Sequence, residues 1–172
     1  SILKGTLQNA SIEVDRLSEG TYVISFVTAS GLQYVITAPG TGPKPVWGDT
    51  AMVDYTGKLT SKKVNGDINV FDTSVEKIAK DNMPPNPGRK YEPVPIPLSE
   101  GVAKGFLEAL QLIAKGGKIT AILPSSIGYG EQGGGPIPPH NPIVFDIEIK
   151  DIKRGMLAPP PPGAFPGPVT NK

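Results

Sequence analysis

The sequence predicts an α+β fold in which one amphipathic helix lies across an antiparallel sheet, with a β-hairpin extension at the N-terminus. Residues 50–59 and 142–152 alternate apolar and polar positions, which is typical of strands with one buried and one solvated face. A clear helical period of apolar residues is confined to residues 99–113. Packing that helix on the sheet is the economical way to bury the apolar face of each.

The N-terminal part of the chain predicts the hairpin. Residues 11–17 and 21–27 are rich in β-branched residues, and Ser18-Glu19-Gly20 between them favours a turn. A third strand is predicted over residues 31–37. The predicted organisation is an extension at residues 1–30, a main domain at residues 31–155 and a Pro-rich flexible tail at residues 156–172.

The strands of the main domain are predicted from the alternation of apolar and polar residues and from turn residues between them. The strand over residues 50–59 has Tyr55 on its apolar face, and Asn65-Gly66 favours a hairpin turn after it. A short helical turn is predicted around Val75. Val94, Ile96 and Leu98 alternate with prolines, whose missing amide donors suit an edge strand.

The single clear helix is predicted to begin at Ser99, a good N-cap, with Glu100 favourable in its first turn. Lys115-Gly116-Gly117 is predicted to close it. A strand over residues 118–124 and a loop over residues 125–141 come next. The apolar face of the helix comprises Val102, Phe106, Ala109, Leu110 and Ile113.

Composition excludes several classes of function. The 172 residues include 17 basic and 16 acidic ones, so the chain has no polycationic character that would bind nucleic acid. The absence of cysteine excludes disulfides, thiolate catalysis and Cys-ligated metals, and the single histidine, His140, leaves no multi-His metal site. No apolar run reaches the roughly 18–20 residues that span a bilayer. We therefore predict no metal, no cofactor, no nucleic-acid partner and no membrane span.

Few reactive groups remain, and an apolar set is the more informative feature. His140 lies in a Pro-rich loop, where bonding to loop carbonyls is the simpler expectation than catalysis. Tyr129 is flanked by glycines in that loop, which is a poor setting for an ordinary sheet-core residue. Each of the others, taken singly, is better explained by a place in the core. The set comprises Tyr55, Phe71, Phe106, Tyr129, Ile137 and Phe145.

Five blocks together resemble the FKBP-type peptidyl-prolyl cis-trans isomerases. They occur in the family's order and cover about residues 40–153. Ser30-Gly31-Leu32-Gln33-Tyr34 is similar to the lead-in of the macrophage-infectivity-potentiator branch, whose members work in the bacterial envelope. The blocks are Gly48-Asp49 with Val53-Asp54-Tyr55-Thr56-Gly57; Phe71-Asp72-Thr73-Ser74; Val102-Ala103-Lys104-Gly105-Phe106; Leu123-Pro124 to Gly128-Tyr129-Gly130; and Ile137-Pro138-Pro139-His140 with Val144-Phe145-Asp146-Ile147-Glu148.

The resemblance implies a sheet of five to six antiparallel strands wrapped around one helix, with an apolar pocket between them. It also implies that the Tyr129 hydroxyl and the Ala103 backbone N–H bind substrate carbonyls. Asp72 would lie at the pocket edge, steadied by Tyr55 and by Arg89 or Lys90. The implied catalytic residues are Tyr55, Asp72, Phe106 and Tyr129, and the implied substrate-binding residues are Phe71, Val102, Ala103, Ile137 and Phe145.

Two positions depart from the family pattern. In the family, the residue that corresponds to Phe106 is usually Trp and forms the pocket floor, and the residue that corresponds to Val94 is commonly Phe. Both replacements reduce aromatic area, which predicts a deeper and weaker pocket. Extra residues at 62–68 and 75–90 lengthen the loops beside it, and the long helical dimerisation arm of the infectivity-potentiator branch is absent from these 172 residues.

Proline isomerisation fits this inventory of residues. Rotation about a peptide bond faces a barrier of roughly 18–20 kcal/mol, and X-Pro bonds have nearly balanced cis and trans forms. No covalent bond is broken, so neither a nucleophile nor a metal is required. The charge separation of the planar amide fades as the bond twists, so a dry apolar pocket favours the transition state over the ground state.

The predicted function is therefore peptidyl-prolyl cis-trans isomerisation that assists protein folding. The alternatives are a low-activity proline-directed binding module or chaperone of the same fold, and an unrelated β-rich structural domain. The expected partners are proline-containing polypeptides and macrolides such as rapamycin or tacrolimus, bound by a monomer. The expected location is the bacterial envelope or periplasm, with the cytoplasm as the alternative.

Overall fold

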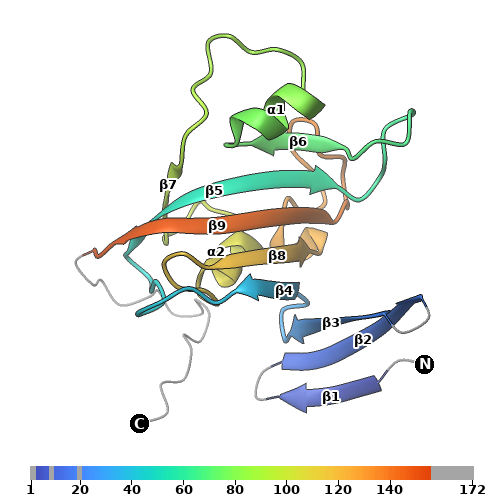
Figure 1. Cartoon of the computed structure of the whole chain (residues 1–172), viewed down its shortest axis with the longest axis vertical. Helices are drawn as coiled ribbons and strands as arrows, with labels where there is room; N and C mark the ends of the chain where they lie inside the picture. The colour runs from blue at the N-terminus through green and yellow to red at the C-terminus, as the bar shows by residue number, and fades with distance from the viewer. Residues whose placement is uncertain (1–2, 8–9, 19–20, 156–172) are drawn as a thin grey trace.

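The described residues form one antiparallel sheet of nine strands with two α-helices (Figure 1). The computed structural model describes residues 3–7, 10–18 and 21–155. The strand order is β1-β2-β3-β4-β8-β9-β5-β6, and β7 pairs with β5 next to β6. The strands are β1 Leu3–Leu7, β2 Ala10–Ser18, β3 Thr21–Thr28, β4 Gln33–Ala38, β5 Thr50–Leu59, β6 Val70–Thr73, β7 Val94–Pro97, β8 Lys118–Leu123 and β9 Ile143–Lys153; the helices are α1 Glu76–Asn82, α2 Lys104–Leu110 and the 3₁₀ turn Ser125–Ile127.

Strands β4 to β9 and helix α2 confirm the predicted fold class. The strands β5 and β9 pair along their whole length, from Thr50 opposite Lys153 to Leu59 opposite Ile143. Alternation along β9 buries one face and leaves the other half-buried, as the sequence pattern predicts. Helix α2 lies against the buried face, behind β8 and β9 in Figure 1, and the core forms between them.

Helix α2 begins later than predicted. Ser99 is not its N-cap, because the helix starts at Lys104 with Ala103 as the N-cap residue. Gly101 has a φ of 96°, a left-handed conformation that turns the chain just before the helix begins. The helix ends at Leu110, well before Lys115-Gly116-Gly117, although the predicted face still reaches the core through Ile113.

The N-terminal extension contains three strands where the sequence predicts two. The predicted hairpin is β2 and β3, and β1 pairs with the outer edge of β2. Strand β3 then pairs with β4 at Phe26–Tyr34 and Val27–Gln33, where the Phe26 and Tyr34 rings stack with centroids 5.4 Å apart. Residues 19–20 of the predicted turn and the predicted tail at 156–172 lie outside the described residues.

The edge beside β5 differs from a simple meander. Strand β7 pairs with the first half of β5 and β6 with the second half, so the two short strands share one edge. The prolines Pro95 and Pro97 lie on β7, which confirms the predicted edge strand. The predicted helical turn near Val75 is α1, which lies beside β6. None of the helices in the described ranges is both long and apolar enough to cross a bilayer.

Candidate functional site

A cavity of about 250 Å³ opens where β5, β6 and β7 meet the N-terminal end of α2. It brings together segments separated by up to 90 residues, from Tyr55 on β5 to Phe145 on β9. Eight of the nine predicted site residues line it. The lining residues are Tyr55, Phe71, Asp72, Val94, Ile96, Gly101, Val102, Ala103, Phe106, Tyr129 and Phe145.

Three phenylalanines form an aromatic floor with edge-to-face contacts. The Phe106 and Phe145 rings lie with centroids 4.9 Å apart at 86°, and Phe71 meets Phe145 at 5.8 Å and 78°. Phe106 and Phe145 are 5% and 4% exposed. Such pairs contribute about 0.5–1.5 kcal/mol each beyond the burial of their area. The floor is therefore rigid and apolar.

Gly57 on β5 permits this arrangement. A Cβ atom at this position would lie 2.4 Å from Phe71 Cζ and 2.9 Å from Phe145 Cε1. Both distances are far below van der Waals contact, so a larger residue would push the two rings apart. The glycine after Tyr55 and Thr56 is thus a packing requirement of the floor.

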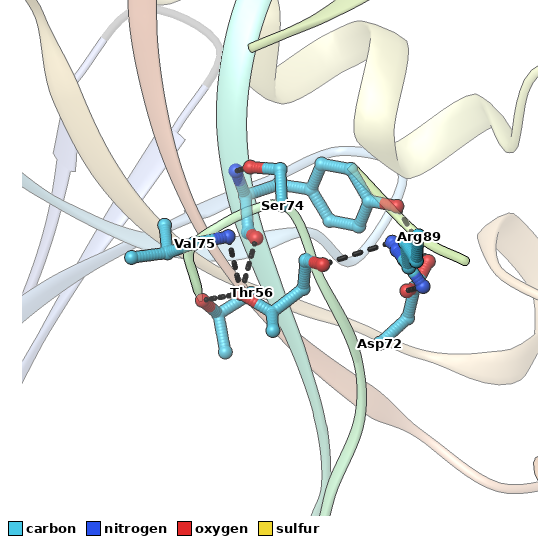
Figure 2. A network of polar contacts seen from close by, with 7 residues as sticks. Thr56, Asp72, Ser74, Val75 and Arg89 are labelled. Carbon is cyan, nitrogen blue, oxygen red and sulfur yellow. Dashed lines mark hydrogen bonds and ion pairs between the residues drawn. The ribbon is translucent and has the colours of Figure 1, made fainter. Parts of the chain in front are cut away.

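A polar cluster holds the carboxylate at the cavity edge (Figure 2). The Tyr55 hydroxyl donates a hydrogen bond to Asp72 Oδ2 at 2.5 Å, and Arg89 Nη1 lies 2.7 Å from Asp72 Oδ1. Arg89 Nη2 also donates to the Thr73 carbonyl oxygen at 2.8 Å. The predicted support of Asp72 by Tyr55 is confirmed, and Arg89 rather than Lys90 supplies the positive charge.

Tyr55 is a neutral hydrogen-bond donor throughout the physiological range. Burial, together with the hydrogen bond to Asp72 and the negative charge of Asp72, raises the pKa of Tyr55 to about 12. Each of these factors disfavours the phenolate, because a second negative charge beside Asp72 would be poorly solvated. The hydroxyl therefore keeps its proton and orients the carboxylate.

Hydroxyl groups clamp β6 to β5 next to this cluster (Figure 2). Thr73 Oγ1 donates to the Tyr55 carbonyl oxygen at 3.0 Å and accepts the Val75 backbone N–H at 3.1 Å. The Tyr55 backbone N–H donates to Ser74 Oγ at 2.9 Å. The bonds from Thr73 and Ser74 join the last residue of β6 and the residue after it to Tyr55 in the middle of β5. They fix the positions from which Tyr55 and Asp72 project.

The remaining predicted groups come from the segment before α2 and from the loop after β8. The Ala103 carbonyl oxygen accepts the backbone N–H groups of Phe106 and Leu107 at 3.0 and 3.1 Å. The Ala103 N–H, by contrast, donates no hydrogen bond among the described residues and remains available at the cavity. Tyr129 also lines the cavity and is 42% exposed.

Ile137 is the predicted site residue that the cavity wall does not include. Its backbone exchanges two hydrogen bonds with Gly134, each of 2.9 Å, which fold the loop back on itself. The side chain is 4% exposed and belongs to the core cluster. Ile137 therefore belongs to the core and not to the lining of the cavity.

Ile96 and Gly101 line the cavity although they were not predicted as site residues. Ile96 shares a face of β7 with Val94, which the alternation of residues 94–98 could have indicated. Gly101 comes from the turn before α2. The late start of the helix places this turn at the cavity, and no local pattern in the sequence reveals it.

Comparisons with known proteins agree with this geometry. Residues 42–150 match the family model described as FKBP-type peptidyl-prolyl cis-trans isomerase. The chain is similar to a probable FKBP-type peptidyl-prolyl cis-trans isomerase of Haemophilus influenzae, at 41% identity over 73% of this chain and 44% of the relative. It is also similar to the outer membrane protein MIP of Legionella longbeachae, at 37% identity over 74% of this chain and 47% of the relative.

A solved structure has the same arrangement of elements. The crystal structure of FkpA from Escherichia coli matches with a TM-score of 0.59 and 33% identity, over 76% of this chain and 52% of that one. The chain thus spans about half the length, or less, of these relatives.

Proposed function

The chain belongs to the FKBP-type peptidyl-prolyl cis-trans isomerase family, and from this premise we propose that its aromatic cavity accelerates the rotation of X-Pro bonds in polypeptides. The observation that carries the proposal is the chemistry of the cavity. Its floor is formed by three phenylalanine rings, and the polar side chains among its lining residues are those of Tyr55, Asp72 and Tyr129.

In the proposed mechanism the apolar floor acts on the amide. Phe71, Phe106 and Phe145 hold the prolyl ring and exclude water from the X-Pro bond. A twisted amide carries less charge separation than a planar one, so it loses less solvation in this environment. The floor thereby binds the transition state more tightly than the ground state, which is the condition for faster rotation.

The edge groups orient the substrate in the same proposal. The free Ala103 N–H and the Tyr129 hydroxyl donate hydrogen bonds to carbonyl oxygens on either side of the proline. Asp72 is held by Tyr55 and Arg89, so that its carboxylate stays at the edge and does not enter the floor. These groups position the peptide, and the aromatic floor accelerates the rotation of the X-Pro bond.

The test compares Phe106→Ala with Asp72→Ala in an isomerisation assay on a short X-Pro peptide. We expect Phe106→Ala to lower kcat/KM about tenfold, the equivalent of about 1.4 kcal/mol of transition-state stabilisation. Asp72→Ala is expected to have a smaller effect. The reverse order would contradict the apolar-floor mechanism.

Two further variants separate activity from folding. Phe106→Leu keeps most of the buried volume, so its activity reports on the aromatic ring even where Phe106→Ala is poorly folded. Phe26→Ala removes an aromatic ring that stacks on Tyr34 in the N-terminal extension, away from the cavity. We expect it to leave kcat/KM unchanged.

A second candidate function is a proline-directed binding module of low activity. Aliphatic Val94 and Ile96 form the β7 side of the cavity, which leaves this wall without an aromatic ring. In that case a proline-containing peptide would bind and Phe106→Ala would weaken binding, while the wild-type chain would raise the isomerisation rate only slightly above the uncatalysed rate.

The proposal extends to ligands, organisation and location. Rapamycin or tacrolimus would compete with peptide for the cavity of a monomeric chain, and residues 31–155 would act as the isomerase unit. The bacterial envelope is the proposed location, supported by the similarity to a relative named as an outer membrane protein. Assisted refolding of a proline-limited protein is the proposed role.

A further inference from the structure

The C-terminal end of β9 is anchored at a fixed point. Arg154 Nη1 donates to Asp49 Oδ2 at 2.5 Å, and Arg154 Nη2 donates to the Pro43 carbonyl oxygen at 3.0 Å. The Gly155 backbone N–H donates to Asp49 Oδ1 at 3.1 Å. A Cβ at Gly155 would lie 1.8 Å from the Gly48 carbonyl oxygen, so this residue is packed against the backbone. The chain therefore leaves the sheet from a defined position.

This exit lies close to the cavity. Ile152 on β9 is paired with Ala51 on β5, and Ala51 is paired with Ile96 on β7. Two spacings between neighbouring strands amount to about 10 Å. Ile96 lines the cavity, so the chain leaves β9 within two strands of the β7 wall (Figure 1).

The segment after Gly155 has the length to reach the cavity floor. Phe145 and Ile152 are seven residues apart on β9, which corresponds to about 23 Å of strand. Pro166 follows Gly155 by 11 residues, which span about 34 Å at the rise of a polyproline II helix. A prolyl ring at position 166 can therefore reach the floor with residues to spare.

The chemistry of residues 156–172 matches the cavity. The segment holds six prolines, and it carries no charged side chain before Lys172. Phe165-Pro166 combines an aromatic residue with a proline, and the small residues Ala164 and Gly167 flank the pair. Proline-rich chain loses little conformational entropy on binding, because its extended conformation is already favoured.

We propose that the cavity binds the C-terminal segment of its own chain, with Pro166 on the aromatic floor. This inference rests on the proposed function, since it assigns the cavity an intramolecular proline ligand. A tethered ligand acts at an effective concentration of about millimolar. Substrate must displace the segment, so the apparent KM of the full chain is raised while kcat is unchanged.

The test uses the full chain with Phe165→Ala and Pro166→Ala combined, and Pro160→Ala as the control. Pro160→Ala also removes one proline but leaves the Phe165-Pro166 pair intact. We expect the double variant to lower the KM for a short X-Pro peptide at least threefold with unchanged kcat. The control is expected to match the wild-type chain. Equal KM values in all three chains would overturn the inference.

A second readout does not depend on turnover. In ¹H–¹⁵N NMR spectra, the Gly101 and Ala103 amide signals are expected to differ between wild type and double variant, and to coincide between wild type and control. The difference should be independent of protein concentration. A difference that grows with concentration would show binding to a neighbouring chain and would overturn the intramolecular arrangement.

The two readouts separate the inference from the proposed function. If no chain accelerates isomerisation but the amide signals respond to the double variant, the proposed function fails and the segment still binds. If the wild-type chain is active and neither KM nor the amide signals respond, the function stands and the inference fails.

Discussion

Two Asp–Arg pairs in this molecule share the same chemistry but differ in how completely their oxygens are used. Asp49 is 2% exposed, and both of its carboxylate oxygens accept hydrogen bonds, from the backbone of Val46 and Gly155 and from Arg154. Asp72 accepts one hydrogen bond, from Tyr55. Its Oδ1 is buried and lies 2.7 Å from Arg89 Nη1, but without hydrogen-bond geometry.

This difference separates a structural carboxylate from one at a binding cavity. Asp49 ties the segment before β5 to the end of β9, and its acceptor capacity is used within the fold. Asp72 lies at the edge of an apolar cavity, where Oδ2 accepts one hydrogen bond from Tyr55 and Oδ1 is paired with the positive charge of Arg89.

The largest expected effect is on stability, from Asp49→Ala. It leaves two backbone N–H groups without acceptors and removes the partner of Arg154, so we expect the free energy of unfolding to fall by about 3 kcal/mol. Urea denaturation measures it. The control Asp151→Ala removes an exposed ion pair with Lys115 near the C-terminal end of β9. It should change the free energy of unfolding by only about 0–1 kcal/mol. Similar losses in both variants would remove the distinction.

The next effect is on activity, from Asp72→Asn. The amide keeps the shape of the carboxylate but removes the charge that orients Tyr55 and Arg89. We expect kcat/KM to fall about fivefold, the equivalent of about 1 kcal/mol, with a smaller change in unfolding free energy than for Asp49→Ala. An Asp72→Asn chain with full activity and markedly reduced stability would make Asp72 a structural residue like Asp49.

The contrast also shows what the sequence could reveal. Alternation within β5 and β9 predicts their buried faces, because a strand's period is a local property. The Asp49–Arg154 pair joins residues 105 positions apart, and neither residue lies in a pattern that indicates the other. The predicted start of α2 was wrong because the position of the helix also depends on the chain around it. Ser99 is a good N-cap by type, but the left-handed turn at Gly101 decides where the helix begins.

At the cavity, the positions of residues on regular elements could be predicted more directly than the positions of residues in loops. Tyr55, Asp72 and Phe106 lie on regular elements, so their positions follow from those elements. Ile137 lies in a loop and belongs to the core. Whether Arg89 or Lys90 reaches Asp72 depends on the path of a long connection, which local propensity does not determine.

A third prediction concerns acid and follows from Asp49. Burial alone would raise the pKa of Asp49, but the hydrogen bonds from Val46 and Gly155 and the Arg154 guanidinium together lower it below its ordinary value. The unfolded chain then binds this proton more readily, so the contribution of Asp49 is complete above the unfolded pKa of about 4 and is lost as pH falls through the folded pKa. The stability advantage of wild type over Asp49→Asn should shrink from pH 6 to pH 2 in urea titrations. A constant difference would contradict the lowered pKa.

The smallest effect at neutral pH is expected from Tyr55→Phe, because it keeps the aromatic ring and removes only one hydrogen bond, the one to Asp72. The pKa of Tyr55 is raised to about 12, so the contribution of its protonated hydroxyl is complete below the unfolded pKa of about 10 and is lost as pH rises through 12. Phenolate absorbance should therefore show a late titration step that Tyr55→Phe abolishes. In Asp72→Asn the step should move to lower pH without reaching the ordinary value, because burial, the largest cause of the shift, remains. If the titration step of Tyr55 stays at the same pH in Asp72→Asn, burial alone sets the pKa of Tyr55. The charge of Asp72 would then have no effect on the ionisation of Tyr55, although the two side chains are hydrogen-bonded.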